Sequence, residues 1–260
     1  MVRAVPDILA RIVEHKHSEL ARDTARRGEL ERRAASLTDH RDFCRALTAH
    51  PPVIIGEIKK ASPSKGVLTD EFDPTAIARM YASGGAAALS VLTDQQFFQG
   101  SLGDLEAARA AVSLPVLRKD FTLDEFHVIE AAAHGADAIL LIAALLEEKE
   151  LRDLRELAAQ YKMAALVEVH DGAELESALS SGAEIVGVNN RNLHTFEVTL
   201  DTSLKLAERI PANVVRVSES GIHSHADVTL LAGAGFQAFL VGEQLMKSAD
   251  PAASLKELRS

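Results

Sequence analysis

Eight short apolar runs alternate with longer stretches rich in Ala, Leu and Glu from Pro52 onward. We interpret the apolar runs as strands, because parallel strands that are buried on both faces show little polar alternation. They cover residues 53–59, 87–92, 115–119, 138–143, 165–170, 185–189, 214–218 and 238–241. The intervening stretches predict helices at 74–83, 102–111, 124–133, 147–160, 172–180, 201–209 and 225–234.

Four of these predicted helices end in a glycine just before the next strand: Gly85, Gly135, Gly182 and Gly235. Glycine at this point accommodates the left-handed conformation that commonly ends a helix. Eight β/α repeats in 260 residues fit a (β/α)8 barrel, which needs roughly 250 residues. An open doubly wound sheet is the alternative, but no glycine-rich dinucleotide fingerprint follows the first strand. We therefore predict the α/β class and a (β/α)8 TIM barrel.

The first 47 residues differ from this repeat. The stretch 6–33 is highly charged, and its apolar positions Ile8, Leu9, Ile12 and Val13 have helical spacing. Pro6 and Asp7 suit the start of a helix. We expect a single barrel domain over residues 1–260, with residues 1–47 as an N-terminal helical extension.

Composition limits the classes of partner. The chain carries 28 Lys and Arg against 38 Asp and Glu, a net charge of −10, which argues against nucleic-acid and membrane-surface binding. A small anionic ligand is still allowed, because it responds to local charges. Cys44 is the one cysteine, so no disulfide can form within the chain, and no signal peptide or membrane-spanning run is apparent. We expect a cytoplasmic protein.

Polar residues gather where the predicted strands end, which is where barrel enzymes form their active sites. Glu57 and Lys59 lie two residues apart on the first strand and should point to the same side. Glu168 interrupts an apolar strand, and a buried carboxylate needs a partner. The other strand ends carry Arg118, Lys119, Asp120, Asn189, Asn190, Arg191, Ser218, Glu219, Ser220 and Glu243. Two lysines and several carboxylates around one pocket suit acid–base chemistry.

Glycines in the last two strand-end loops indicate a phosphate site. Barrels often bind phosphate with the loops after strands seven and eight, which here contain Gly221 and Gly242. Glycine lets backbone N–H groups approach an anion. The loop after the first strand adds the hydroxyls of Ser62 and Ser64 and the cation of Lys65.

Metal binding is not expected. Neither the pair His15 and His17 nor the pair His223 and His225 has a nearby third ligand at metal-site spacing. His170 follows Glu168 by two residues, which is a weak indication of function. We interpret the histidines as structural or exposed.

Several motifs, in order, resemble the indole-3-glycerol phosphate synthase family of tryptophan biosynthesis. They are GEIKKASPSKG (56–66), GGAAALSVLTDQQFFQGS (84–101), LPVLRKDF (114–121), LVEVHD (166–171), GVNNRNL (187–193), SESGI (218–222) and LVGEQLM (240–246). The family converts 1-(2-carboxyphenylamino)-1-deoxyribulose 5-phosphate to indole-3-glycerol phosphate, CO2 and water. The resemblance therefore implies a lyase that acts on a phosphorylated small molecule without a cofactor or metal.

The resemblance also implies residue roles. Lys119 would be the general acid of ring closure, and Lys59 would hold the substrate carboxylate, with the acid of the dehydration step left open between them. Glu168 would be the base or would stabilise the cationic intermediate, Glu57 would position both lysines, and Asn189 would orient the reacting hydroxyl. The remaining roles are contact with the aromatic part of the substrate (Ser220, Phe98, Phe121), phosphate binding (Ser62, Gly221, Gly242, the backbone of Glu243) and support of the site (Arg191, Glu219). Some relatives carry a hydroxyl residue at the position of Glu243, so only its backbone is assigned.

Two other functions remain as alternatives. Phosphoribosylanthranilate isomerase would use a Cys/Asp pair, but Cys44 precedes the first strand. A catalytically silent barrel that only binds a phosphorylated metabolite has no reason to retain Lys59, Lys119 and Glu168 together. We also expect a protein without the isomerase domain fused to some relatives, and a monomer, with a weak homodimer as the alternative.

Overall fold

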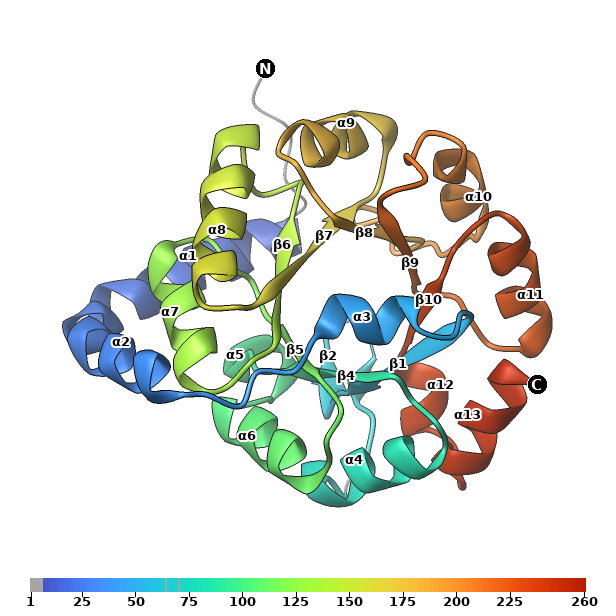
Figure 1. Cartoon of the computed structure of the whole chain (residues 1–260), viewed down its shortest axis with the longest axis horizontal. Helices are drawn as coiled ribbons and strands as arrows, with labels where there is room; N and C mark the ends of the chain where they lie inside the picture. Colours follow the sequence, from blue (N-terminus) through green and yellow to red (C-terminus); the bar gives the residue numbers. More distant parts are fainter. Residues whose placement is uncertain (1–6, 64, 70) are drawn as a thin grey trace.

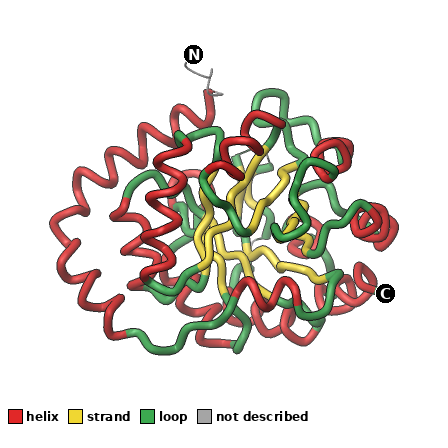
Figure 2. Tube along the Cα trace, turned by 45° about the horizontal axis from the view of Figure 1, so that its top comes forward, coloured by secondary structure: helices red, strands yellow, loops and turns green. Residues whose placement is uncertain are grey.

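The computed structural model describes residues 7–63, 65–69 and 71–260. Pro6 and Ser64, which the sequence analysis used, lie outside this part. Eight parallel strands form a closed barrel in the order β1-β10-β9-β8-β7-β6-β5-β4. Figure 1 shows helices surrounding the strands, and Figure 2 shows the strands gathered at the centre. The predicted (β/α)8 barrel is confirmed.

The barrel strands are β1 (Val53–Ile58), β4 (Ala88–Leu92), β5 (Val116–Lys119), β6 (Ala138–Ile142), β7 (Ala164–Val169), β8 (Ile185–Asn189), β9 (Val215–Glu219) and β10 (Ala238–Val241). Their predicted bounds agree to within one residue at each end. Lys59 and His170, which were predicted to end the first and fifth strands, follow those strands instead. A two-stranded hairpin, β2 (Ala61–Ser62) with β3 (Gly66–Val67), lies in the loop after β1 and was not predicted.

The outer helices are α4 (Pro74–Ser83), α6 (Leu102–Ala111), α7 (Glu125–Ala133), α8 (Glu148–Gln160), α9 (Gly172–Ser180), α10 (Asp201–Ala207), α11 (His225–Gly233) and α13 (Pro251–Arg259). Short helices α5 (Gln95–Phe98) and α12 (Glu243–Met246) follow β4 and β10. The four predicted terminal glycines have positive φ: 87° at Gly85, 79° at Gly135, 86° at Gly182 and 96° at Gly235. Among the described residues, we find no helix with both the length and the apolar character needed to span a membrane.

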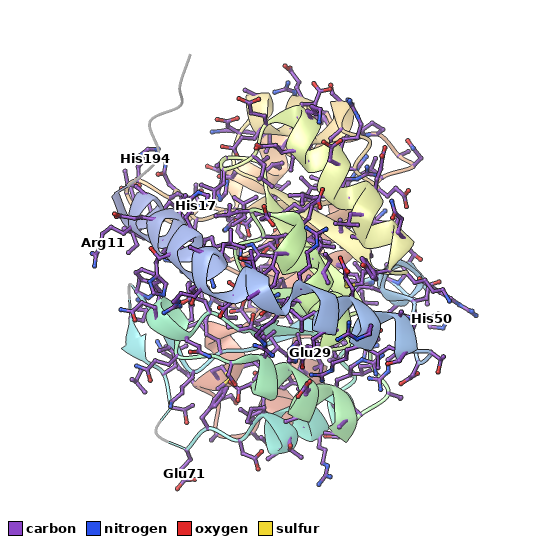
Figure 3. The ribbon with its side chains drawn as sticks, turned by 90° about the vertical axis from the view of Figure 1, so that its left-hand side faces the viewer. Arg11, His17, Glu29, His50, Glu71 and His194 are labelled. Carbon is purple, nitrogen blue, oxygen red and sulfur yellow. The ribbon has the colours of Figure 1, made fainter. Side chains whose placement is uncertain are left out.

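The N-terminal region is helical from Asp7, as predicted. It comprises α1 (Asp7–Asp23), the 3-10 turn η1 (Thr24–Arg26), α2 (Arg27–Ser36) and α3 (Phe43–Thr48). Figure 3 shows α1 and α2 along one side of the molecule, with the exposed Arg11 pointing away from it. Helix α3 lies across the end of the barrel where the strands begin, and its Phe43 and Leu47 are buried against the inward-facing Val53 and Ile55.

Two apolar layers lie on either side of the strands. Inward-facing residues such as Ile55, Leu117 and Leu166 pack in the barrel interior. Their neighbours Ile54, Val116 and Val167 face outward and pack with the surrounding helices. Because side chains alternate along a strand, this arrangement fixes which polar residues point into the mouth of the barrel.

Candidate active site

Strand alternation brings the predicted acid–base residues together at the end of the barrel where the strands finish. In β1, Val53 and Ile55 face inward, so Glu57 and then Lys59 continue on the same face. The same rule turns Lys119, Glu168 and Glu219 into the mouth from β5, β7 and β9. The three glutamates are 6%, 3% and 1% exposed, so these carboxyl groups are almost fully removed from solvent.

Lys59, which follows β1, pairs through its Nζ with Oε1 of Glu57 in that strand. This contact is the one that the two-residue spacing predicts. Gly242, at the end of β10, makes room for it, because a Cβ there would lie 2.3 Å from Glu57 Oε1. Glycine at this position is therefore required by the carboxyl group that it faces.

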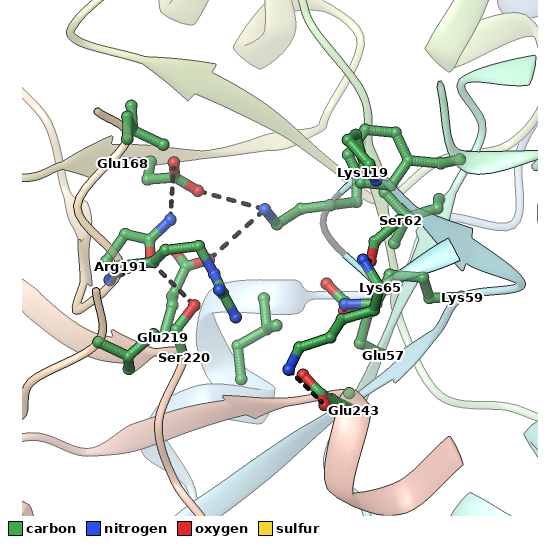
Figure 4. A pocket seen from close by; sticks show the side chains of 18 of the residues that line it. Glu57, Lys59, Ser62, Lys65, Lys119, Glu168, Arg191, Glu219, Ser220 and Glu243 are labelled. Atoms are coloured by element: carbon green, nitrogen blue, oxygen red, sulfur yellow. Dashed lines mark hydrogen bonds and ion pairs between the residues drawn. The ribbon is translucent and has the colours of Figure 1, made fainter. Parts of the chain in front are cut away.

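Lys119 lies between two carboxyl groups (Figure 4). Its Nζ is 3.2 Å from Glu168 Oε2 and 3.6 Å from Glu219 Oε2. Neither oxygen of Glu219 has a hydrogen-bond partner among the described residues. Gly187 of β8 accommodates this side chain, since a Cβ there would lie 2.2 Å from Glu219 Oε1.

Burial and charge shift the pKa values of this group in opposite directions. Burial raises the pKa of Glu219 to about 8, with the nearby carboxylates of Glu168 and Glu57 adding to the rise and Lys119 opposing it. Burial also acts to raise the pKa of Glu168, but Lys119, His170 and Asn189 together hold it below its usual range. Burial would lower the pKa of Lys119, yet the carboxylates of Glu168 and Glu219 keep it above its usual range. One carboxylate, one carboxylic acid and one ammonium therefore share the site near neutral pH.

Asn189 connects Glu168 to the loop after β9. Its Nδ2 donates to Glu168 Oε1 at 3.2 Å, and its Oδ1 accepts from Ser220 Oγ at 2.9 Å and from the Arg191 backbone N–H at 3.0 Å. Ser220 adopts φ 65°, a left-handed conformation that is uncommon for a residue other than glycine. These contacts fix the amide orientation beside the base candidate.

The predicted phosphate residues lie around one side of the same pocket. Ser62, Gly221 (φ 77°), Gly242 and Glu243 all line it. The short helix α12 begins at Glu243, immediately after Gly242. The Glu243 carboxylate pairs with Lys247 Nζ at 2.6 Å and lies 3.9 Å from Nζ of Lys65, which lines the same pocket. The backbone role of Glu243 stays a prediction.

The pocket has a volume of about 440 Å³ and combines this polar floor with apolar walls. Phe98 of α5 and Phe121 line it with ring centroids 6.3 Å apart. Ile8, Leu9 and Ile12 of α1 also line it. The sequence analysis predicted α1 but not its place at the pocket; the apolar spacing showed a buried face without showing what that face covers.

Helix α1 is attached to the barrel by a second group of buried charges. Lys16 is 4% exposed, and its Nζ lies 2.8 Å from Asp120 Oδ1 and 3.1 Å from Asp94 Oδ2. Arg118 pairs with Asp120 at 3.2 Å and with Glu130 at 2.8 Å. We call Lys16, Thr93, Asp94, Arg118, Asp120 and Glu130 the anchor cluster. We call Glu57, Lys59, Lys119, Glu168 and Glu219 the mouth cluster.

His170 was assigned no place in the site from the sequence, yet it adjoins the mouth cluster. Its Nε2 lies 3.4 Å from Glu168 Oε1. The only signal in the sequence was its two-residue spacing from Glu168. Among the described residues, no group of three or more His, Cys, Asp or Glu side chains is arranged to hold a metal ion.

A family model for indole-3-glycerol phosphate synthase matches residues 9–258. The chain belongs to the indole-3-glycerol phosphate synthase family. Proteins of that name from Albidiferax ferrireducens, Burkholderia vietnamiensis and Chromobacterium violaceum are each 51% identical over 258 residues, which is 97% of this chain and 98%, 98% and 97% of theirs. The resemblance drawn from the motifs is confirmed, and with it the function in tryptophan biosynthesis.

More distant solved structures share the fold alone. An N-acetylmannosamine-6-phosphate 2-epimerase from Clostridium perfringens superposes with a TM-score of 0.62 at 15% identity and covers 80% of this chain and 93% of its own. A thiamine phosphate pyrophosphorylase from Pyrococcus furiosus gives 0.61 at 18% identity, with the same coverage of 80% and 93%. Identities this low carry the barrel architecture and no residue roles.

Proposed function

We propose that this chain is a carbon–carbon lyase that closes the indole ring of 1-(2-carboxyphenylamino)-1-deoxyribulose 5-phosphate in the pocket described above. The observation that carries the proposal is the mouth cluster, two lysines and three glutamates in one pocket with aromatic walls. Ring closure needs a proton for a ketone oxygen, and dehydration needs one proton removed and one delivered to the departing hydroxyl. Ammonium and carboxyl groups held on strands supply both.

Lys119 is the acid of ring closure. Its ammonium protonates the ketone oxygen while the ring carbon that bears the carboxylate attacks the ketone carbon. Loss of CO2 from that ring carbon then leaves its bonding electrons in the ring. The carboxyl groups on either side of Lys119 support this role, because the Glu168 carboxylate favours the ammonium form and both groups confine it to one place before substrate binds.

Lys59 binds the substrate carboxylate, and Glu57 restricts where its ammonium can reach. Glu168 is the base of the later steps: it removes a proton from the substrate, while a lysine ammonium, that of Lys59 or Lys119, protonates the hydroxyl, which leaves as water. Asn189 and Ser220 support this assignment because their hydrogen bonds hold an amide and a hydroxyl beside Glu168. Glu219 keeps a carboxyl group near Lys119. Arg191, in the loop after β8, lines the same pocket and supports the site.

The phosphate lies against Ser62 and the backbone N–H groups near Gly221, Gly242 and Glu243. Glycines after β9 and β10 and the start of a short helix are the features with which (β/α)8 barrels commonly bind phosphate. Binding energy gained there acts away from the reacting carbons and helps to orient them. Phe98 and Phe121 pack against the aromatic ring.

The test is turnover by the purified protein without added metal or nucleotide. We expect formation of indole-3-glycerol phosphate, followed by indole absorbance and fluorescence, across pH 6 to 8.5. A folded sample that makes no product over this range contradicts the proposal. Binding of the substrate without turnover would instead support the silent barrel.

A further inference from the structure

His170 lies between the carboxyl groups of Glu168 and Glu174. The chemistry proposed above uses Glu168 but neither His170 nor Glu174. It follows the last residue of β7, two residues after Glu168, so its side chain points to the same side of the strand. Its Nδ1 is 3.0 Å from Oε2 of Glu174, and that same oxygen accepts the His170 backbone N–H at 2.8 Å. Its Nε2 is 3.4 Å from Glu168 Oε1. The side chain is 12% exposed, so solvent screens these contacts little.

We propose that His170 is a positioning residue that is held as an imidazolium by Glu174, places a positive charge beside Glu168 Oε1 and so keeps Glu168 an ionised base during turnover. The inference rests on the proposed role of Glu168.

The division of contacts around Glu168 supports this role. One oxygen, Oε2, faces Lys119, and the other, Oε1, faces Asn189 and His170. Two cations therefore approach Glu168 from opposite oxygens. Hydrogen bonds from Lys119 and Asn189 orient the Glu168 carboxylate. His170 Nε2 has no hydrogen-bond partner among the described residues, so His170 acts on Glu168 through its charge at 3.4 Å.

The order of proton transfers makes the second cation important. When Lys119 gives its proton to the ketone, it becomes neutral, and Glu168 loses the charge opposite Oε2. Glu168 is needed as a base only after that step. His170 does not touch the reacting atoms in this scheme, so its charge persists and still favours the carboxylate form of Glu168.

The electrostatic surroundings agree with a charged imidazole. Burial would lower the pKa of His170, but the carboxylates of Glu168 and Glu174 raise it to about 10. The site faces further ionisable groups on other elements. Lys119 on β5 and Glu219 on β9 act on Glu168, and Glu57 on β1 acts on Glu219. The ionisable residues that share a second pocket with His170 are Asp171, Glu174, Arg191, His194 and Glu197.

The first test is His170→Asn, whose amide can still donate toward Glu174 but carries no charge. We expect kcat to fall about 10- to 100-fold with KM nearly unchanged, a smaller loss than the roughly 10²- to 10⁴-fold expected from losing the base itself. His134→Asn is the matched control. It removes a similar His–Glu pair, with Nδ1 2.8 Å from Glu106 Oε1, at the end of the barrel where strands begin. It should leave both constants as in the wild type.

A double-mutant cycle separates positioning from a general structural role. In a Glu168→Gln background, His170→Asn should cost little further activity, because its effect passes through Glu168. The full loss in that background, or wild-type kcat for His170→Asn alone, overturns the proposal.

A spectroscopic reading is independent of activity. In protein labelled with ¹⁵N-histidine, both ring nitrogens of His170 should remain protonated at pH 8, and Glu174→Gln should lower the pH at which one is lost. A neutral imidazole at pH 8 in the folded wild type overturns the inference. An inactive wild-type enzyme would contradict the proposed function instead, so the two failures are distinguishable.

Discussion

The anchor cluster and the mouth cluster meet at the end of β5, yet their charges are satisfied very differently. Arg118 faces outward into the anchor cluster and Lys119 faces the pocket, whereas Asp120 belongs to the anchor cluster and also lines the pocket. In the anchor cluster, Asp120 contacts Lys16, Arg118 and Thr93 at 2.8, 3.2 and 2.6 Å. Asp94 Oδ2 has no hydrogen-bond partner among the described residues, but Lys16 Nζ lies 3.1 Å from it. In the mouth cluster, Glu219 has no hydrogen-bond partner among the described residues, and Lys119 Nζ lies 3.6 Å from its Oε2.

This difference separates a structural from a chemical use of buried charge. A satisfied network of ion pairs and hydrogen bonds holds its elements in one arrangement. An incompletely satisfied one retains groups that can still bind a ligand or exchange a proton, at a cost in stability. We therefore expect the anchor cluster to govern stability and the mouth cluster to govern turnover.

The largest expected effect is on turnover. Lys119→Met should lower kcat by about 10² to 10⁴-fold, since the acid of ring closure is removed. The free energy of unfolding should change little, because Glu219 is already a carboxylic acid near neutral pH and Glu168 keeps His170 and Asn189 as partners. Steady-state kinetics with urea unfolding of the same samples tests both. A near-wild-type kcat removes Lys119 from its role.

The second effect is on stability. Lys16→Met leaves Asp94 without its ion-pair partner and removes one from Asp120, so we expect a loss of about 3 kcal/mol in the free energy of unfolding. Because α1 lines the pocket, KM should also rise. Lys149→Met, which breaks an exposed pair with Asp153, is the control and should change stability by less than about 0.5 kcal/mol. Equal stability of the two variants would show that the anchor cluster does not hold α1.

A smaller effect depends on pH. The pKa of Glu219 is raised to about 8 in the folded protein, above its value in the unfolded chain. Between these two values the folded state binds more protons, so ionisation of Glu219 lowers stability progressively as pH rises toward 8. Glu219→Gln removes this dependence. We expect the melting temperature of Glu219→Gln, relative to that of the wild type, to rise by a few degrees as the pH is raised from 5 to 8.5. A difference between the two proteins that does not change with pH contradicts the raised pKa.

The smallest expected effect concerns the pocket wall. Phe98→Leu keeps an apolar side chain but removes the ring that packs with Phe121. We expect KM to rise several-fold, since an aromatic contact is worth roughly 0.5–1.5 kcal/mol, while kcat changes little. A fall in kcat with unchanged KM would instead place Phe98 near the reacting atoms.

The same comparison explains what the sequence could predict. The mouth cluster follows from alternation within single strands, so Glu57 and Lys59, two residues apart, could be assigned to one face from the sequence. Gly221 and Gly242 could also be assigned to the pocket from the sequence, because each follows a recognisable strand.

The anchor cluster could not be predicted, because its members come from distant segments. Lys16, Asp94 and Asp120 each look like an ordinary solvated charge, and only the folded chain shows that they share one buried site. The apolar face of α1 likewise gave no indication of its target. The two-residue spacing from Glu168 was a signal for His170 in the sequence. The role inferred for His170 also depends on Glu174, which lies on the following helix, and that contact could not be predicted.

The most direct measurement is a crystal structure with indole-3-glycerol phosphate bound. We predict the phosphate against the backbone near Gly221 and Gly242, the indole ring beside Phe98 and Phe121, and the Lys119 ammonium and Glu168 carboxylate facing the ring and its glycerol chain. A product bound outside this pocket, or bound within it with the Lys119 and Glu168 side chains turned away, would contradict the assignment of the mouth cluster as the catalytic group.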